Sequence, residues 1–148
     1  MTDCVAVYVE IEKGSNIKYE FNKDTQMLEV DRVLPTQFAY PHAYGFIPGT
    51  LAADGDDLDA LIITTVPLER DKTYTCHIVD ALRMEDEKGN DEKVICTLDG
   101  SDVSPATLAH IETFFATYKL NCPEKWSRTD GYMGKAAAIA LYQTYKSS

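Results

Sequence analysis

Residues 54–63 read DGDDLDALII: four carboxylates fall within six positions, and an apolar run follows them directly. A short run of consecutive apolar residues is typical of a strand that is buried in a sheet. Because this run enters the core, it carries Asp59 toward the interior. Unit charges about 5 Å apart repel by roughly 3 kcal/mol at an effective dielectric near 20. Carboxylates crowded at this point therefore need cations or protons to compensate them.

Further short segments with β-type patterns lie on both sides of this strand. We expect strands at residues 5–11, 18–21, 27–33, 58–66, 74–84 and 93–98. Residues 34–53 contain three prolines and two glycines together with four bulky aromatic side chains. This composition predicts an irregular segment that packs against the body of the fold.

The last third of the chain changes to a helical period. Ser104-Pro105 is typical of a helix start, because Ser caps the helix and Pro is tolerated at its first position. Apolar residues then recur at helical spacing until Asn121-Cys122-Pro123, and residues 134–146 predict a second, Ala-rich helix. Strands followed by two helices indicate an α+β domain, either a small barrel or a curled sheet with helices packed outside. The pattern alone leaves both architectures open.

Length and composition limit the classes of protein to which the chain can belong. The 148 residues predict a single domain spanning 1–148, with the 45% hydrophobic and 26% charged residues of an ordinary globular protein. The net charge of −10 argues against binding of nucleic acid or anionic membranes. No signal peptide and no membrane span are indicated. The four cysteines include no CxxC pair, so free thiols in a reducing cytoplasm are expected.

Two acidic segments indicate a metal site. An EF-hand loop that began at Asp54 would need Gly at its sixth position and Glu at its twelfth. Those positions hold Asp59 and Thr65, which excludes an EF-hand. A second acidic stretch, residues 85–93 (EDEKGNDEK), also lies where one strand ends and the next begins. Taken alone it reads as a solvated hairpin turn, but two such loops could face one another and hold more than one divalent cation.

Basic and phenolic side chains accompany the acidic segments: Lys18, Arg32, Lys93, Tyr118 and Lys119. Each alone is typical of a surface charge or a simple ion pair. As a set with metal ions, they suit a polyanion such as a phosphate ester or anhydride. The chain has no GxxxxGK[ST] loop and no nucleophilic Ser or Cys constellation, so the pattern favours metal-assisted hydrolysis by water.

The acidic run 54–59 resembles the DGDPxD signature of the family I soluble inorganic pyrophosphatases. Other segments resemble motifs of the same family in the same order: 10–15 with 18–20 (EIPxGS…KYE), 31–32 (DR), 40–47 (YPxNYGxI), 86–93 (DExGxDxK) and 114–119 (FFxxYK). Ordered motifs with similar spacing are far more specific than any one of them. The resemblance implies an OB-like five-stranded β-barrel with two flanking C-terminal helices.

The resemblance also implies the reaction and the site. A cytoplasmic homo-oligomer would hydrolyse pyrophosphate to two phosphates with a metal-activated water, using several Mg²⁺ ions per active site, with Mn²⁺ or Zn²⁺ as substitutes. The implied metal ligands are Asp54, Asp59, Asp86 and Asp91, joined by Asp56 and Glu20. Asp56 would deprotonate the water, and the phosphate-binding residues would be Lys18, Arg32, Tyr44, Lys93, Tyr118 and Lys119. Lys18, Arg32 and Tyr44 would act with Asp56 in catalysis, and Glu10 and Asp31 would support the site.

The sequence departs from the family pattern at two places. Asp57 stands where the family usually has Pro, which adds a charge beside the expected metals. The connection from Val94 to Thr117 is shorter than in common bacterial members, which leaves hexamer, trimer and dimer open. The alternative function is a non-catalytic domain that binds divalent metal or phosphate on the same fold. An OB-fold nucleic-acid binder is disfavoured by the charge, and a nucleoside-triphosphate hydrolase lacks a visible base-binding motif.

Overall fold

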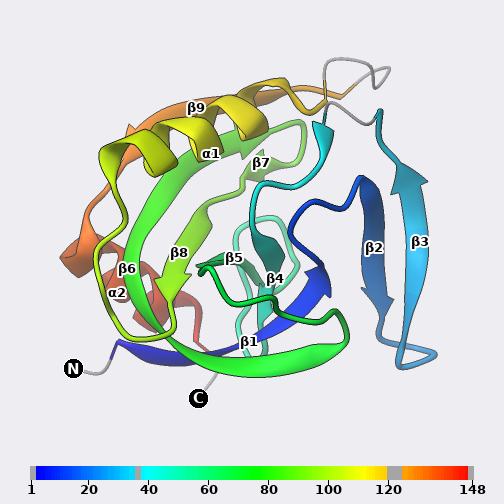
Figure 1. Ribbon diagram of the computed structural model, residues 1–148, viewed down its shortest axis with the longest axis horizontal. Coiled ribbons are helices and arrows are strands. Elements are labelled where there is room, and N and C mark those ends of the chain that lie inside the picture. Colours follow the sequence, from blue (N-terminus) through cyan, green and yellow to red (C-terminus); the bar gives the residue numbers. More distant parts are fainter. Residues whose placement is uncertain (1–2, 36–37, 120–124, 147–148) are drawn as a thin grey trace.

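The structure, a computed structural model, describes residues 3–35, 38–119 and 125–146 (Figure 1). Its centre is a closed ring of five strands: β1 (Cys4–Ile11), β4 (Ala43–Ile47), β5 (Leu58–Ile63), β8 (Lys93–Thr97) and β6 (Lys72–Asp86). The ring closes where β6 pairs with β1, from Cys4 opposite His77 to Val9 opposite Lys72. Only β5 and β8 are parallel among these ring pairs. The predicted five-stranded OB-like barrel is confirmed.

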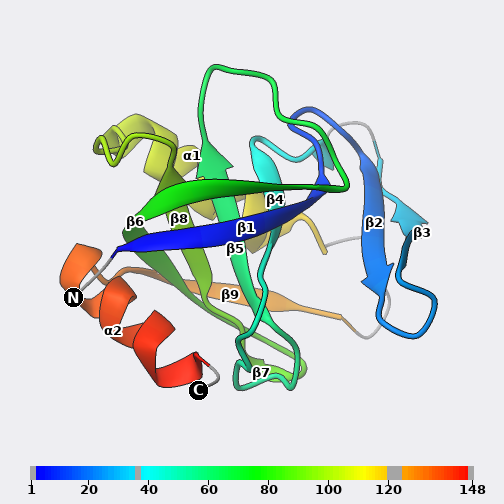
Figure 2. The same cartoon turned by 90° about the horizontal axis from the view of Figure 1, so that it is seen from below.

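A hairpin stands beside the barrel as a separate two-stranded sheet. It consists of β2 (Ile17–Asn22) and β3 (Met27–Val33), with Lys18 directly opposite Arg32. Both views place this hairpin at one side of the barrel and the C-terminal helix at the other (Figures 1 and 2). The short strand β7 (Gly89–Asn90) and the strand β9 (Ser127–Tyr132) pair with the far part of β6.

Two helices pack outside the barrel, as predicted. Helix α1 (Pro105–Thr117) begins with Pro, and the side chain of Ser104 accepts a hydrogen bond from the Thr107 amide. This cap satisfies one of the amides that a helix start leaves without an internal partner. Helix α2 (Lys135–Tyr145) buries Ala138 and Ile139 against the barrel. The expected helix stop at 121–123 lies outside the described residues.

An aromatic cluster fixes α1 to the open end of the barrel. Tyr40 lies 4.9 Å from Phe114 and 5.2 Å from Tyr44 between ring centroids, and Tyr44 lies 5.8 Å from Phe115. Tyr118 packs against both phenylalanines at 5.4 Å. Buried aromatic pairs of this kind contribute beyond the area they bury. The cluster therefore holds Tyr44 and Tyr118 in fixed positions at one end of the barrel.

Three strands were not expected from the sequence: β4, β9 and the two-residue β7, which lies in the stretch expected to be a hairpin turn. The segment 34–53, predicted to be irregular, contains β4, which pairs with both β1 and β5. The prolines at 41 and 48 and a glycine at 45 hid this strand. Gly45 is needed there, because a Cβ would lie 1.7 Å from the backbone oxygen of Tyr8. Strand β9 is mostly polar, so its pairing with β6 carries no hydrophobic alternation that sequence analysis could detect.

Three of the four cysteines lie in the described part of the chain. Among the described residues no disulfide joins Cys4, Cys76 and Cys96, and Cys76 and Cys96 are buried in the barrel, while Cys122 lies outside them. No helix in the described part of the chain has the length and apolar character that crossing a membrane requires.

His42 gives the barrel an acid-sensitive position. Its Nδ1 is buried with no hydrogen-bond partner among the described residues, and burial, with Lys13 and His110 nearby, lowers its pKa to about 4. A histidine whose pKa is lower in the folded than in the unfolded state does not affect stability above the unfolded-state pKa, which is near 6.5. As the pH falls from there toward the folded-state pKa, the unfolded state binds the proton more readily, and the folded protein becomes less stable. The ring is partly exposed, so solvent screens its charge, and we expect the loss of stability at acid pH to be about 1 kcal/mol.

We therefore predict that the difference in free energy of unfolding between a His42→Leu variant and the parent changes with pH. As the pH falls from about 7.5 to about 5, this difference should shift by about 1 kcal/mol in favour of the variant. Urea unfolding of both proteins in EDTA measures the difference at each pH. A stability difference that stays constant between the two pH values would contradict the prediction, whatever its size at neutral pH.

Candidate active site

A cleft of about 260 Å³ opens between the end of the barrel, the hairpin β2–β3 and the end of α1. Every site residue named by the sequence lies on its wall: Glu10, Lys18, Glu20, Asp31, Arg32, Tyr44, Asp54, Asp56, Asp59, Asp86, Asp91, Lys93, Tyr118 and Lys119. These residues come from elements far apart in the chain, and the fold brings them together in one place. Their individual roles stay predictions.

The loop before β5 presents its carboxylates through local backbone structure. At its base, the Thr50 hydroxyl donates to the Ile47 carbonyl at 2.6 Å and accepts from the Leu58 amide at 2.8 Å. The Ala52 amide donates to the Asp56 carbonyl at 2.8 Å, and Gly55 adopts a φ of +89° that other residues avoid. The loop is therefore tightly closed, with its polar side chains directed to the cleft.

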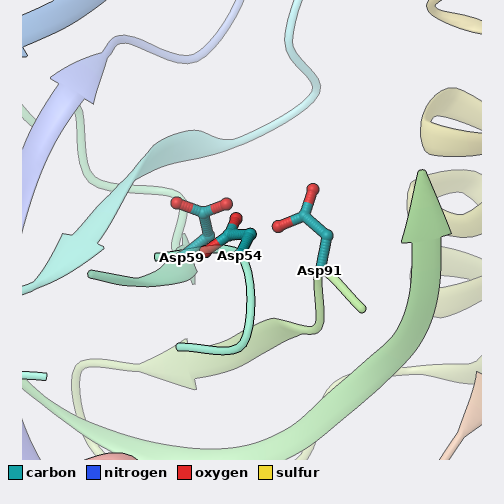
Figure 3. Close-up of side chains that lie close together, drawn as sticks. All are labelled: Asp54, Asp59 and Asp91. Atoms are coloured by element: carbon teal, nitrogen blue, oxygen red, sulfur yellow. The ribbon is translucent and has the colours of Figure 1, made fainter. Parts of the chain in front are cut away.

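Three carboxylates form a cluster suited to a divalent cation. Asp54, Asp59 and Asp91 each contribute an oxygen, and these oxygens all lie within 4.8 Å of one another. Figure 3 shows Asp91 facing the other two across a short gap. The parallel pairing of β5 with β8 produces this arrangement, because it sets Asp59 opposite Lys93, two residues after Asp91. An all-oxygen set of this kind fits hard cations such as Mg²⁺.

Lys93 lies beside this cluster and is almost fully buried, at 1% exposure. Its ammonium group donates to Asp59 at 2.7 Å, to Asp91 at 2.9 Å and to the Tyr44 hydroxyl at 2.8 Å. Burial alone would lower the pKa of Lys93, but the two carboxylates outweigh it and raise the pKa above its usual range. Lys93 therefore stays charged and provides a fixed positive charge in the interior.

The other carboxylates show how strongly the cleft needs positive charge. Burial raises the pKa of Glu10 to about 7, although its carboxylate accepts a hydrogen bond from the Phe21 amide at 2.9 Å. Burial also raises the pKa values of Asp54 and Asp91 above the usual range. Groups shifted in this way bind either a proton or a cation.

Cationic side chains line the opposite parts of the cleft. On the hairpin, Lys18 and Arg32 both lie 3.4 Å from Asp31. Burial would raise the pKa of Asp31, but these two cations outweigh it and lower the pKa. At the end of α1, Lys119 lies 3.0 Å from Asp86 and 3.4 Å from Glu87. Asp86 therefore lines the cleft beside Lys119 and lies outside the three-carboxylate cluster.

The charge balance of the cleft restricts what it can bind. Ten carboxylates and seven Lys or Arg side chains line it, so its net charge is negative. A polyanion would be repelled by this surface unless divalent cations first neutralised the carboxylates. The arrangement suits an anion that arrives together with metal ions.

Sequence reasoning did not assign some residues that line the same cleft, among them Lys23, Lys88, Glu87 and Lys125. Glu87 contacts both Lys119 and the Trp126 amide. Asp57, the departure from the family pattern, lies 2.8 Å from Lys23. No local signal in the sequence indicated that Lys23 would meet the acidic loop.

Comparison with known proteins gives consistent matches. The family model described as inorganic pyrophosphatase matches residues 7–148. The inorganic pyrophosphatase of Helicobacter pylori is 40% identical, over 95% of this chain and 88% of its own. That of Gluconobacter oxydans is 42% identical, over 90% of this chain and 84% of its own. A solved inorganic pyrophosphatase from Coxiella burnetii superposes with a TM-score of 0.92 at 35% identity, covering 97% of this chain and 94% of that one.

Proposed function

The chain belongs to the family I inorganic pyrophosphatases and hydrolyses pyrophosphate, and we propose that it does so with Mg²⁺ held by the carboxylates of the cleft. Divalent metal use follows from the family. The observation that carries the choice of a hard cation is the convergence of the Asp54, Asp59 and Asp91 oxygens. Mg²⁺ typically binds through one or two carboxylates, waters and substrate phosphates. Mn²⁺ and Zn²⁺ are candidate substitutes.

The proposed ligand set extends the cluster. Asp86, Asp56 and Glu20 line the same cleft and would complete the coordination of several ions, directly or through water. Bound metal ions would lower the pKa of an attacking water and neutralise the phosphoryl oxygens. Glu10 and Asp31 would support this arrangement: Glu10 by its contact with β2, and Asp31 by its contacts with Lys18 and Arg32.

The proposed chemistry is direct transfer to water. The water oxygen forms a bond to one phosphorus while the bridging P–O bond breaks, and Asp56 accepts the proton of the water. Asp56 is exposed at the cleft, where substrate and water can reach it. No covalent intermediate is needed, since phosphoryl transfer depends chiefly on positioning and electrostatic stabilisation.

The cationic and phenolic side chains would bind the two phosphates. Lys18 and Arg32 extend from the hairpin, and Tyr118 and Lys119 from the end of α1, so the two groups approach from different walls. Lys93 and Tyr44 lie between them at the base, joined by a hydrogen bond of 2.8 Å. Groups held in this way stabilise the charge that develops on the leaving phosphate without reorganising.

A phosphate-release assay tests the proposal. We expect rapid release from pyrophosphate with Mg²⁺, loss of release in EDTA, and little release from ATP. Parallel assays with Mn²⁺ and Zn²⁺ would rank the substitutes. An absence of release with all three metals would contradict the enzymatic function and favour the non-catalytic metal-binding or phosphate-binding domain.

The organisation implied by the resemblance is also a proposal. We infer a single domain spanning 1–148, acting as a homo-oligomer in the cytoplasm on a small-molecule substrate, without nucleic-acid or membrane partners. Sedimentation velocity would distinguish hexamer, trimer and dimer, and a monomer at micromolar concentration would contradict the homo-oligomer.

A further inference from the structure

The tip of the hairpin β2–β3 contacts the acidic loop, residues 54–59, through an ion pair. Lys23 Nζ lies 2.8 Å from Asp57 Oδ1, and the two residues are 34 positions apart. The side chain of Asp57 is 13% exposed and that of Lys23 is 68% exposed. The pair therefore bridges two separate walls of the cleft at its edge, with the carboxylate on the more buried side.

The hairpin turn holds Lys23 in place for this contact. The side chain of Asn22 accepts hydrogen bonds from the amides of Asp24 and Thr25 at 2.8 and 3.1 Å. Gln26 has a φ of +60°, and its side chain donates to the Lys23 carbonyl at 2.6 Å. The backbone of Lys23 is therefore fixed by the turn, and only its side chain needs to be ordered to reach Asp57.

Other contacts hold the hairpin at its base and close to its tip. At the base, the Leu34 amide donates to the Asn16 carbonyl at 2.8 Å, and the Asn16 side chain donates back to the Leu34 carbonyl at 2.8 Å. Near the tip, the Phe21 ring lies 5.3 Å from that of Tyr8, and the Phe21 amide donates to the Glu10 carboxylate at 2.9 Å. An isolated two-stranded hairpin is marginally stable in water. The placement of its tip therefore depends on contacts with the rest of the protein.

The position of the hairpin matters because it carries proposed phosphate-binding groups. Lys18 and Arg32 face each other across β2 and β3 near the base of the hairpin, and Lys23 lies in the turn at its other end. The ion pair also compensates Asp57, which would otherwise add an uncompensated charge next to Asp56. The opposite side of the contact is rigid, because Thr50 holds the amide of the next residue, Leu58.

We propose that the Lys23–Asp57 ion pair is a latch that positions the hairpin wall, and with it Lys18 and Arg32, against the acidic loop. The inference rests on the proposed function in one respect only, that the cleft binds pyrophosphate. Lys23 and Asp57 are positioning residues, since they act through the hairpin and not on the substrate. An exposed ion pair stabilises a contact only modestly. Its loss should therefore change the equilibrium between the docked and the released hairpin by about 1.5- to 5-fold.

The test uses Lys23→Met, Asp57→Ala, the double variant and the conservative variant Lys23→Arg. The matched control is Lys135→Met, which removes an equally charged, half-exposed lysine whose partner, Asp3, lies outside the cleft. The structural measurement is hydrogen exchange of the amides at 17–33, with those of β6 as an internal reference. The kinetic measurements are kcat and KM for pyrophosphate at saturating Mg²⁺.

We expect exchange in the hairpin to rise about 1.5- to 5-fold in either single variant and no further in the double variant. KM should rise by a similar factor with kcat nearly unchanged, and Lys23→Arg should behave as the parent. High salt should bring the parent toward the variants, because it screens exposed charges.

Two results would overturn the latch. Hairpin exchange in Lys23→Met that equals that of Lys135→Met would show that the ion pair does not hold the hairpin. Effects of Lys23→Met and Asp57→Ala that multiply in the double variant would show that the two residues act independently. If the parent releases no phosphate, the proposed function fails, while the exchange measurement still decides on the latch.

Discussion

An Asp56→Asn variant is expected to lose most of its pyrophosphate hydrolysis, by about 10²- to 10⁴-fold in kcat, and to keep its fold. Asp56 is the carboxylate of the acidic loop that is most open to solvent, whereas Asp54 and Asp59 are partly buried within the cluster. Asn has the same shape as Asp but cannot accept the proton of the attacking water. The kcat with Mg²⁺, together with the melting temperature, measures both parts of the expectation.

A control separates this effect from a general change of charge. Asp102→Asn removes the same charge at an exposed position that does not line the cleft, and it should leave kcat unchanged. Turnover of Asp56→Asn close to that of the parent would remove Asp56 from the proposed role as base. Loss of turnover with a lowered melting temperature would instead indicate that the loop needs the Asp56 side chain for its structure.

Much of the site could be predicted because its residues occur in short motifs. The run 54–59 contains its carboxylates and the start of the strand that carries them inward, so sequence alone placed Asp59 near the core. The spacing within 86–93 similarly set Asp91 and Lys93 on one strand start. Local spacing of this kind is retained in the fold, and all the residues named from it lie on one cleft.

The remainder depended on contacts between distant segments. The closure of the ring by β1 and β6 was expected only from the family resemblance, since alternation indicates which face of a strand is buried and not which strand lies beside it. Strand β4 was hidden by flanking prolines, although its pairing with β1 and β5 overrides the local preference. The Lys23–Asp57 contact is of the same kind, because each residue alone reads as a solvated surface charge.

Lys93→Met is expected to abolish hydrolysis and to lower the free energy of unfolding by about 3 kcal/mol in EDTA. The substitution retains an unbranched apolar side chain but leaves Asp59 and Asp91 without their shared cation. Removing one partner of a buried ion pair is costly because the remaining charge stays desolvated. Asp59 is 22% exposed at its side chain and Asp91 is 9% exposed, so the expected loss lies at the lower end of the range for buried pairs.

Divalent cations should reverse much of this loss of stability, though not the loss of activity. Mg²⁺ bound by Asp54, Asp59 and Asp91 would supply the missing charge, and binding to the folded state stabilises it by mass action. Urea unfolding in EDTA and in millimolar Mg²⁺ should therefore show a larger metal-induced gain for Lys93→Met than for the parent, while Lys135→Met matches the parent. An equal gain in Lys93→Met and the parent would contradict this expectation, because it would mean that bound metal does not replace the charge of Lys93 beside Asp59 and Asp91.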